Sequence, residues 1–204
     1  MRLNKSTKIV SDRVILVPYR IQHVPKYHKW MENELLREQT ASERLSLDEE
    51  YAMQQTWLHD ENKCTFIALD KGKMLETNDE IESMIGDANL YLRIDEDQDA
   101  PILIGEVGLM VADNAFRGKG LGKEIALCLI RYGIEAIGIK RFQAVISLKN
   151  ATSINMFEKL DFEKMSVSEV FDEVTFEREV NSDFIRFILD RTLNYSIEQT
   201  VPNK

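Results

Sequence analysis

Hydrophobic residues recur along this chain at two spacings, which predict strands interleaved with helices. Short runs rich in β-branched and apolar residues are typical of strands. Five such runs are Arg13–Arg20, Cys64–Asp70, Met84–Leu92, Pro101–Asp113 and Arg141–Leu148. Two further strands are expected in residues 162–180. The fourth run is long and largely apolar, which is typical of a strand buried on both faces near the centre of a sheet.

Apolar residues spaced three and four apart predict five helices. They span His23–Arg37, Ser46–Leu58, Leu121–Ile137, Asn150–Leu160 and Phe184–Tyr195. The second begins with Ser46 three residues before Glu49, which is the pattern of a capping box. A polar loop is expected between the second and third strands. The order of elements predicts a mixed α/β sheet with flanking helices.

Length and composition predict one domain. A chain of 204 residues, 44% of them hydrophobic, can bury one core, so we expect a single domain over residues 1–204, with residues 196–204 as a flexible tail. No run of eighteen apolar residues and no secretion-signal pattern occurs, so we expect no membrane partner. Cys64 and Cys128 lie far apart and form no CxxC motif, which favours a reducing, cytoplasmic location.

The formal net charge of −9 argues against a nucleic-acid partner, because most of the surface repels phosphate. An acidic surface suits a cationic acceptor, although most acidic proteins are simply well solvated. The three histidines, His23, His28 and His59, have no metal-ligand spacing, so we expect no metal site.

The stretch NAFRGKGLGKEIALCL, residues 114–129, places three alternate glycines directly before a helical pattern. Its glycine and lysine spacings match neither a P-loop nor a dinucleotide fingerprint. A helix that begins after such a loop presents backbone N–H groups without intrahelical partners, and these favour a pyrophosphate. Arg117, Lys119 and Lys123 add positive charge around this position. A plain glycine-rich turn with solvated lysines is the alternative that the loop alone leaves open.

Two blocks of the sequence resemble the GNAT superfamily of acetyl-CoA-dependent N-acetyltransferases. Arg117, Gly120 and Gly122 in RGKGLG match the family motif Q/R-x-x-G-x-G/A, and residues 145–162 are similar to its second block. The resemblance covers residues 14–180. It implies a mixed α/β fold with a central six- to seven-stranded mixed sheet, splayed between the fourth and fifth strands and flanked by helices. It also implies acetyl-CoA as the cosubstrate.

The resemblance assigns acetyl-CoA binding to the end of the fourth strand, the glycine loop and the helix after the fifth strand. The residues are Leu109, Met110, Val111, Arg117, Gly118, Lys119, Gly120, Leu121, Gly122, Lys123, Asn150, Ser153 and Phe157. Asn150 suits a coenzyme contact and a helix N-cap equally well. Phe157 stands where family members often carry a tyrosine that protonates the departing thiolate. The proton then comes from water or another residue such as Tyr132, or the thiolate leaves unassisted.

Two carboxylates interrupt otherwise apolar strands and are the candidate catalytic bases. Glu106 lies within the fourth strand, and Asp87 lies on the polar face of the third strand with Asn89 and Tyr91. A carboxylate in such a position is a candidate for accepting a proton from the acceptor amine. The alternatives are a carboxylate in water at a strand end, one paired with an arginine, or a water chain as the base.

Eight segments distributed over the chain resemble the N-acetyltransferase 9-like branch of the superfamily more closely. They include LVPY, TASERLSLDEEYAMQ, GDANLYL and FRGKGLGKE. This resemblance implies a protein amine as acceptor, the N-terminal residues of α- and β-tubulin, and a role in microtubule stability. Two alternatives remain open. One is a catalytically silent protein that binds coenzyme A or associates with tubulin, which Phe157 favours. The other is an acetyltransferase for small-molecule amines, which predicts a closed acidic pocket.

Overall fold

A nine-stranded mixed sheet forms the centre of the computed structural model, within the described residues 1–96 and 100–200. Its strands are β1 (Thr7–Val10), β2 (Val14–Pro18), β3 (Lys63–Asp70), β4 (Met84–Asp95), β5 (Ile102–Val111), β6 (Arg141–Ser147), β7 (Glu163–Ser168), β8 (Glu173–Glu179) and β9 (Ser196–Gln199). Their order across the sheet is β7-β8-β6-β5-β4-β3-β2-β1-β9. Neighbouring strands run antiparallel except β5 and β6, which run parallel. The predicted mixed α/β sheet is confirmed.

Helices flank this sheet. They are α1 (Val24–Met31), α2 (Glu34–Gln39), α3 (Leu47–His59), α4 (Lys71–Thr77), α5 (Glu80–Ser83), α6 (Leu121–Tyr132), α7 (Ala151–Lys159) and α8 (Ser182–Asp190). A 3-10 turn, Asn114–Phe116, precedes α6, and a π-helical turn, Gly133–Ile137, follows it. In the part of the chain that the structure describes, no helix has the length and apolarity needed to cross a bilayer.

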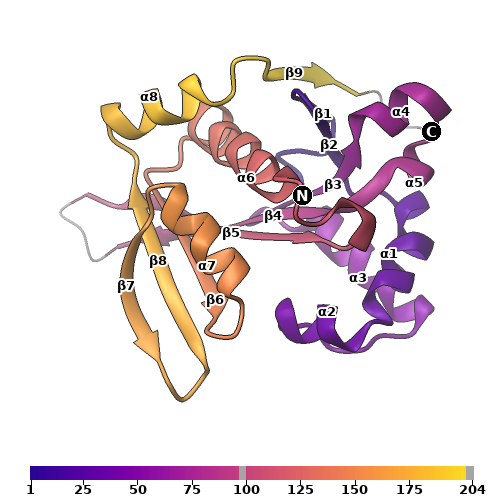
Figure 1. The fold of residues 1–204 in the computed structure, drawn as a ribbon, viewed down its shortest axis with the longest axis horizontal. Coiled ribbons are helices and arrows are strands. Elements are labelled where there is room, and N and C mark those ends of the chain that lie inside the picture. Colours follow the sequence, from indigo (N-terminus) through magenta and orange to yellow (C-terminus); the bar gives the residue numbers. More distant parts are fainter. Residues whose placement is uncertain (97–99, 201–204) are drawn as a thin grey trace.

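The two faces of the sheet bury separate hydrophobic cores. Helices α6, α7 and α8 cover one face (Figure 1), where Phe66, Leu129 and Phe184 are fully buried. Helices α1 and α3 pack on the other face, where Tyr27 and Ile67 are buried. Because successive strand residues point to opposite faces, each residue of β4 and β5 is committed to one of these two environments.

One edge of the sheet differs from the sequence prediction. Residues 196–204 are not a tail throughout, because Ser196–Gln199 forms β9 and pairs with β1. Residues 201–204 lie outside the described residues. Strands β1 and β9 extend the sheet beyond the expected six to seven strands. Four-residue strands carry too little periodic pattern to be recognised, and their pairing with distant segments decides their conformation.

The expected polar loop between β3 and β4 contains two short helices. An oxygen of Asp70 accepts a 2.7 Å hydrogen bond from the backbone N–H of Lys73. Asp79 accepts one of 2.9 Å from the backbone N–H of Glu82. Aspartate N-caps satisfy the free N–H groups at a helix start. They therefore stabilise α4 and α5 in a segment whose apolar periodicity is weak.

Candidate active site

The glycine loop between β5 and α6 passes twice through the left-handed region of backbone conformation. The φ angle is +70° at Gly118 and +78° at Gly120, where a Cβ atom is strained. Gly120 is the N-cap of α6 and has no side chain with which to cap that helix. The N–H groups of the first turn therefore lie at the positive end of the helix dipole without a side-chain acceptor. This geometry fits the pyrophosphate site that the sequence predicts.

Arg13, directly before β2, fixes the position of the glycine loop. One of its terminal nitrogens donates to the backbone carbonyl of Lys119 at 2.9 Å. Its Nε donates to Oε2 of Glu124 at 2.8 Å. Glu124 belongs to the first turn of α6. Because the guanidinium group offers several donors in a rigid fork, one side chain joins the loop to the helix.

The three basic residues expected around the loop occupy different environments. Arg117 turns back onto the end of β5, where its Nε donates to the carbonyl of Val111 at 2.7 Å. Lys119 is exposed, with its Nζ 5.4 Å from the centre of the Phe116 ring. Lys123 is half-buried in the first turn of α6. Arg117 thus shapes the loop, whereas Lys119 is free to approach an anion.

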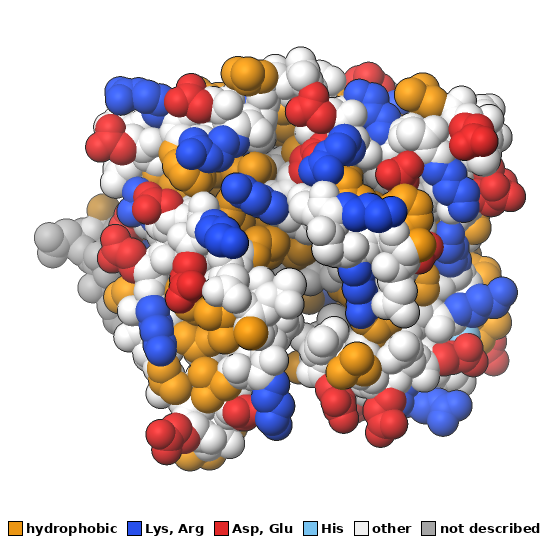
Figure 2. Space-filling view, viewed as in Figure 1, with side chains coloured by type: hydrophobic (Ala, Val, Ile, Leu, Met, Phe, Trp, Pro, Cys, Tyr) orange, Lys and Arg blue, Asp and Glu red, His pale blue; other side chains and the backbone are white. Residues whose placement is uncertain are grey.

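Basic side chains are prominent on the face of the molecule that carries α6 and the glycine loop, as Figure 2 shows. The same face is hollowed between α7 and the loop before α6 (Figures 1 and 2). A negatively charged protein with lysines and arginines gathered at one depression offers a local attraction for phosphate there.

Strands β5 and β6 separate beyond Glu106. They pair only where Ile104–Glu106 lies beside Arg141–Gln143. Among the described residues, the edge of β5 that faces β6 therefore has no neighbouring strand over Val107–Val111. An extended molecule with amide groups can pair with such an edge as an added strand. These strands are the predicted fourth and fifth, so the predicted splay between them is confirmed.

Gly122 lies beside the opening between β5 and β6. A Cβ atom at this position would lie 3.7 Å from the side chains of Leu109 and Val111 on β5 and 3.8 Å from Met156 on α7. The first turn of α6 therefore meets the free end of β5 and the side of α7. The glycine loop and the splayed strands form one continuous site.

The register between β4 and β5 brings both candidate bases to one face of the sheet. Asp87 pairs with Met110, and Tyr91 pairs with Glu106. Residues separated by an even number along a strand point to the same side. Asp87, Tyr91 and Glu106 therefore share the face on which α1 and α3 pack, because Tyr27 of α1 contacts Asp87 directly.

Asp87 is buried among hydrogen-bond donors. The amide of Asn89 donates to its Oδ2 at 2.9 Å, and the Tyr27 hydroxyl donates to the same oxygen at 3.4 Å. Thr65 donates to the carbonyl oxygen of the Asn89 side chain at 2.8 Å, which orients that amide. Burial raises the pKa of Asp87 to about 6, against the opposing effect of these donors. A carboxylate with a pKa near physiological pH is suited to accepting a proton.

Lys63 is a buried cation on the same face, with only 4% of its surface exposed. Its Nζ lies 3.0 Å from the centre of the Trp57 ring and donates to the Tyr91 hydroxyl at 3.3 Å. Burial lowers the pKa of Lys63 to about 8, and the charge of Asp87 opposes that change. Lys63 and Asp87 therefore stabilise each other's charged forms where burial disfavours both.

Glu106 lies where β5 and β6 begin to separate and is more exposed than Asp87. Burial raises its pKa, while the positive charge of Arg93 lowers it. Tyr91 is affected by both carboxylates. Burial, followed by the charges of Asp87 and Glu106, raises the pKa of Tyr91 to about 12. Both carboxylates can accept a proton, and Asp87 is the better shielded from water.

Comparisons with known proteins agree with this geometry. Residues 13–163 match the family described as acetyltransferase (GNAT) domain. The chain belongs to the GNAT acetyltransferase family. An N-acetyltransferase 9-like protein of Nematostella vectensis is 48% identical over 200 residues, which cover 97% of this chain and 98% of that protein. The protein named alpha/beta-tubulin-N-acetyltransferase 9 in Homo sapiens is 44% identical over 195 residues, which cover 94% and 92%.

Solved structures confirm the GNAT fold. The spermidine N-acetyltransferase of Vibrio cholerae in complex with CoA and spermine superimposes with a TM-score of 0.68 at 16% identity. The match covers 82% of this chain and 95% of that one. At this identity the similarity establishes the fold alone.

In this GNAT acetyltransferase, three residues predicted to contact the coenzyme lie in α7 or at its N-cap. The side chain of Asn150 is the N-cap and accepts a 3.1 Å hydrogen bond from the backbone N–H of Ser153. Phe157 is only 3% exposed and packs edge-to-face on Phe162 at 5.0 Å between ring centres. Asn150 is thus a cap, and Phe157 belongs to the core. Contacts of Asn150, Ser153 and Phe157 with the coenzyme stay predictions.

Tyr132, the last residue of α6, lies in the hydrophobic core on the face of the sheet opposite to Tyr27 and Asp87. It is only 3% exposed, and its hydroxyl donates to the carbonyl of Leu3 at 3.3 Å. Its role as the proton donor stays a prediction.

Three contributors to the site were missed by sequence reasoning: Arg13, Tyr27 and Lys63. Each comes from a segment distant in sequence from the group that it contacts. The sequence contains a weak signal for only one of these three residues, Lys63. Lys63 and Thr65 are polar residues at alternate positions at the start of an apolar strand, on the face that also carries Asp87.

Proposed function

We propose that this acetyltransferase transfers the acetyl group of acetyl-CoA to the N-terminal amine of a protein, and that the acceptor is tubulin. The observation that carries the proposal is the 44% identity, over 94% of this chain, to the human relative whose name specifies α/β-tubulin. A role in microtubule stability and a cytoplasmic place of action belong to the same proposal. Cys64 and Cys128 are free, buried thiols, which a reducing compartment preserves.

The residues of the glycine loop and β5 suit coenzyme A. The uncapped first turn of α6, with Gly118 and Gly120 before it, would hold the pyrophosphate through backbone N–H groups. Lys119 and Lys123 would add charge-assisted contacts. The free edge at Val107–Val111 would pair with the amides of the pantetheine arm. When bound, acetyl-CoA supplies the activated carbonyl that the amine attacks.

The groups on the opposite face suit an N-terminal amine. An α-amine with a pKa of about 8 is partly neutral at physiological pH, whereas a lysine at about 10.4 needs a stronger base. Asp87, ionised above its pKa of about 6, accepts the proton that the amine loses. Tyr91, with a pKa of about 12 and 42% of its surface exposed, keeps its proton and is assigned to protonating the thiolate.

The proposal is tested by measuring the release of free thiol from acetyl-CoA. The acceptors are N-terminal peptides of α- and β-tubulin, the same peptides with a blocked N-terminus and an internal lysine, and spermidine. We expect release with the free N-termini alone. Coenzyme binding without release from any acceptor would support the silent alternative. Preferential turnover of spermidine would support a small-molecule amine as the substrate.

A further inference from the structure

A small cavity is lined in part by Tyr27, which contacts the proposed base Asp87. Its volume is about 250 Å³, and it lies between α1, α3 and the loop that joins α2 to α3. Its lining residues are Tyr27, Met31, Ser42, Glu43, Leu45, Glu50, Met53 and Trp57. We call it the Glu50 cavity. Drug-sized ligands occupy pockets of roughly 300–1,000 Å³, so a cavity of this size suits a single side chain.

Two residues that line the Glu50 cavity also contact the groups around Asp87. Tyr27 lines the cavity and also donates its hydroxyl hydrogen to Asp87. Trp57 lines the cavity and also covers the ammonium group of Lys63. A peptide with its N-terminal amine at Asp87 would therefore pass this cavity within its first residues.

Glu50 is a buried carboxylate in this cavity, and one of its oxygens lacks a hydrogen-bond partner in the described part of the chain. It is 1% exposed, and its Oε2 has no hydrogen-bond partner among the described residues. Its Oε1 lies 3.9 Å from Nδ1 of His28, which is longer than a hydrogen bond. Burial raises the pKa of Glu50, and the contact with His28 opposes that change. A buried carboxylate is unfavourable unless a donor or cation compensates it.

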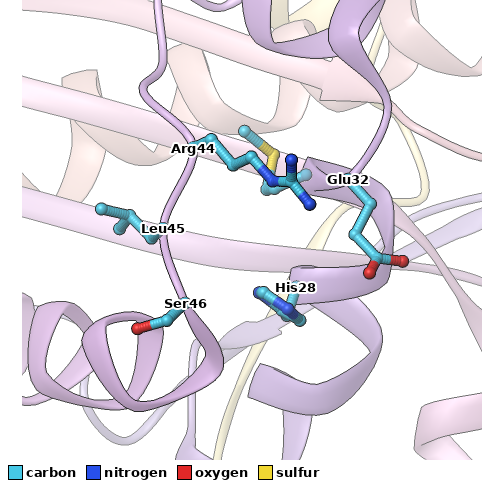
Figure 3. Close-up of a pocket in the computed structure, with 6 residues that line it drawn as sticks. His28, Glu32, Arg44, Leu45 and Ser46 are labelled. Carbon is cyan, nitrogen blue, oxygen red and sulfur yellow. The ribbon is translucent and has the colours of Figure 1, made fainter.

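His28 supplies a second unsatisfied atom at the same place. Its buried Nδ1 also has no hydrogen-bond partner among the described residues. It lines a neighbouring cavity of about 320 Å³ that shares Met31 and Leu45 with the Glu50 cavity. Figure 3 shows this second cavity, with His28 of α1 and Glu32, the C-cap of that helix, on one side and the loop before α3, which carries Arg44, on the other. Since an imidazole nitrogen can accept, a ligand with several N–H donors can satisfy both atoms.

We propose that the Glu50 cavity binds a lysine or arginine side chain close to the N-terminus of the protein acceptor, with Glu50 as its counter-ion. This inference rests on the proposed function, because it assigns a neighbouring residue of the same acceptor. The apolar stem of the basic side chain packs against Met31 and Met53, while its charged head reaches Glu50. Tyr27 and Trp57 give the cavity aromatic walls, and Glu43 adds a second negative charge to its lining.

The test compares peptides that differ at one position. The peptides have a free N-terminus and either lysine or norleucine at residue 2 or 3, and their other side chains are uncharged. The two peptides of a pair therefore differ in one side-chain charge. Their dissociation constants are measured by fluorescence anisotropy in the presence of coenzyme A, independently of turnover. We expect the lysine peptide to bind at least tenfold more tightly than the norleucine peptide at one of the two positions. Glu50→Gln abolishes this preference and leaves the norleucine peptide unaffected.

Asp48→Asn is the matched control. Asp48 lies in the first turn of the same helix, is exposed and does not line the cavity. This variant keeps the lysine preference, and thermal denaturation verifies that both variants fold. An undiminished preference in Glu50→Gln, or none in the unaltered protein, would overturn the inference. So would a Glu50 dependence that is larger for spermidine than for the lysine peptide. Because binding is measured separately from thiol release, a charge preference without turnover would count against the proposed function only.

Discussion

The hydroxyl of Tyr27 on α1 lies 3.4 Å from Oδ2 of Asp87 on β4. This contact joins two parts of the chain that are separated by 60 residues. It connects the base proposed to accept the proton with the cavity proposed to bind the neighbouring side chain of the acceptor. Asn89 donates to the same oxygen, so the carboxylate is held from the helix and from its own strand.

Replacing Asp87 tests its assignment as the base. Asp87→Asn removes the proton acceptor and keeps the size of the side chain. Because general-base catalysis contributes about 10²–10⁴-fold, we expect the turnover number to fall by that factor. Coenzyme affinity, measured by calorimetry, stays unchanged. A variant that keeps more than a tenth of the activity would show that another group accepts the proton.

The pH dependence of turnover reports the same group. The rate should fall as the pH drops through about 6, because protonated Asp87 cannot accept a proton. The positive charge of Lys63 lowers the pKa of Asp87. Lys63→Met should therefore move the inflection of the kcat profile to higher pH. An inflection that stays in place in this variant contradicts the coupling between the two residues.

Asp87 should also limit the stability of the fold. Its pKa is about 6 in the folded protein and 3.8 in its ordinary state, so the folded state binds the proton more tightly. Stability therefore falls as the pH rises from about 4 to 6. Above that range, Asp87→Asn removes an unfavourable contribution of up to about 3 kcal/mol to the free energy of folding. Thermal denaturation should show a higher Tm for the variant at pH 8, and no gain at pH 4.

Glu106 is tested by an isosteric change. Glu106→Gln should lower turnover while coenzyme affinity stays intact, because Glu106 lies at the start of the splay and away from the glycine loop. Because Glu106 is more exposed than Asp87, we expect a smaller loss of turnover than in Asp87→Asn. Thiol release across a pH series provides the measurement. Rates equal to those of the unaltered protein throughout would remove Glu106 from the catalytic groups.

The glycine loop is tested with a matched pair of glycines. Gly120 and Gly138 have φ angles of +78° and +82°, so alanine at either position costs roughly 1–2 kcal/mol of backbone strain. Only Gly120 adjoins the proposed pyrophosphate site. Gly120→Ala should weaken coenzyme binding, and Gly120→Glu should abolish it through charge repulsion. Gly138→Ala should lower the Tm similarly without changing affinity. Unchanged coenzyme affinity in Gly120→Glu would contradict the site.

Arg13 is expected to act on coenzyme affinity by positioning the loop. Arg13→Gln removes the donor to the Lys119 carbonyl and leaves Glu124 without its cation. A hydrogen bond to a charged group contributes about 1.5–3 kcal/mol, so coenzyme affinity should fall by at least about tenfold. Arg2→Gln is the control, because Arg2 pairs with Glu61 at an exposed site. Equal calorimetric affinities of the two variants for the coenzyme would show that the Arg13 side chain does not affect coenzyme binding through the loop.

Local features of the sequence determined the cofactor side of this site. Gly118 and Gly120 take the left-handed conformations that other residues avoid, and the helix after them starts without a cap. Such properties belong to consecutive residues, so the stretch RGKGLG sufficed to predict a glycine loop that leads into a helix with free N–H groups. The alternation of apolar residues likewise predicted seven of the strands and placed Asp87 among polar neighbours.

Only the tertiary structure decided which distant residues meet. The register of β4 against β5 sets Tyr91 opposite Glu106 and brings both carboxylates to one face. The packing of α1 and α3 buries Lys63 and leaves one oxygen of Glu50 without a hydrogen-bond partner among the described residues. The pKa of a carboxylate depends on its burial and on the charges around it, and both are set by segments far apart in the chain. Sequence spacing therefore predicted the glycine loop as the coenzyme site, while the arrangement of the proposed acceptor side follows from packing.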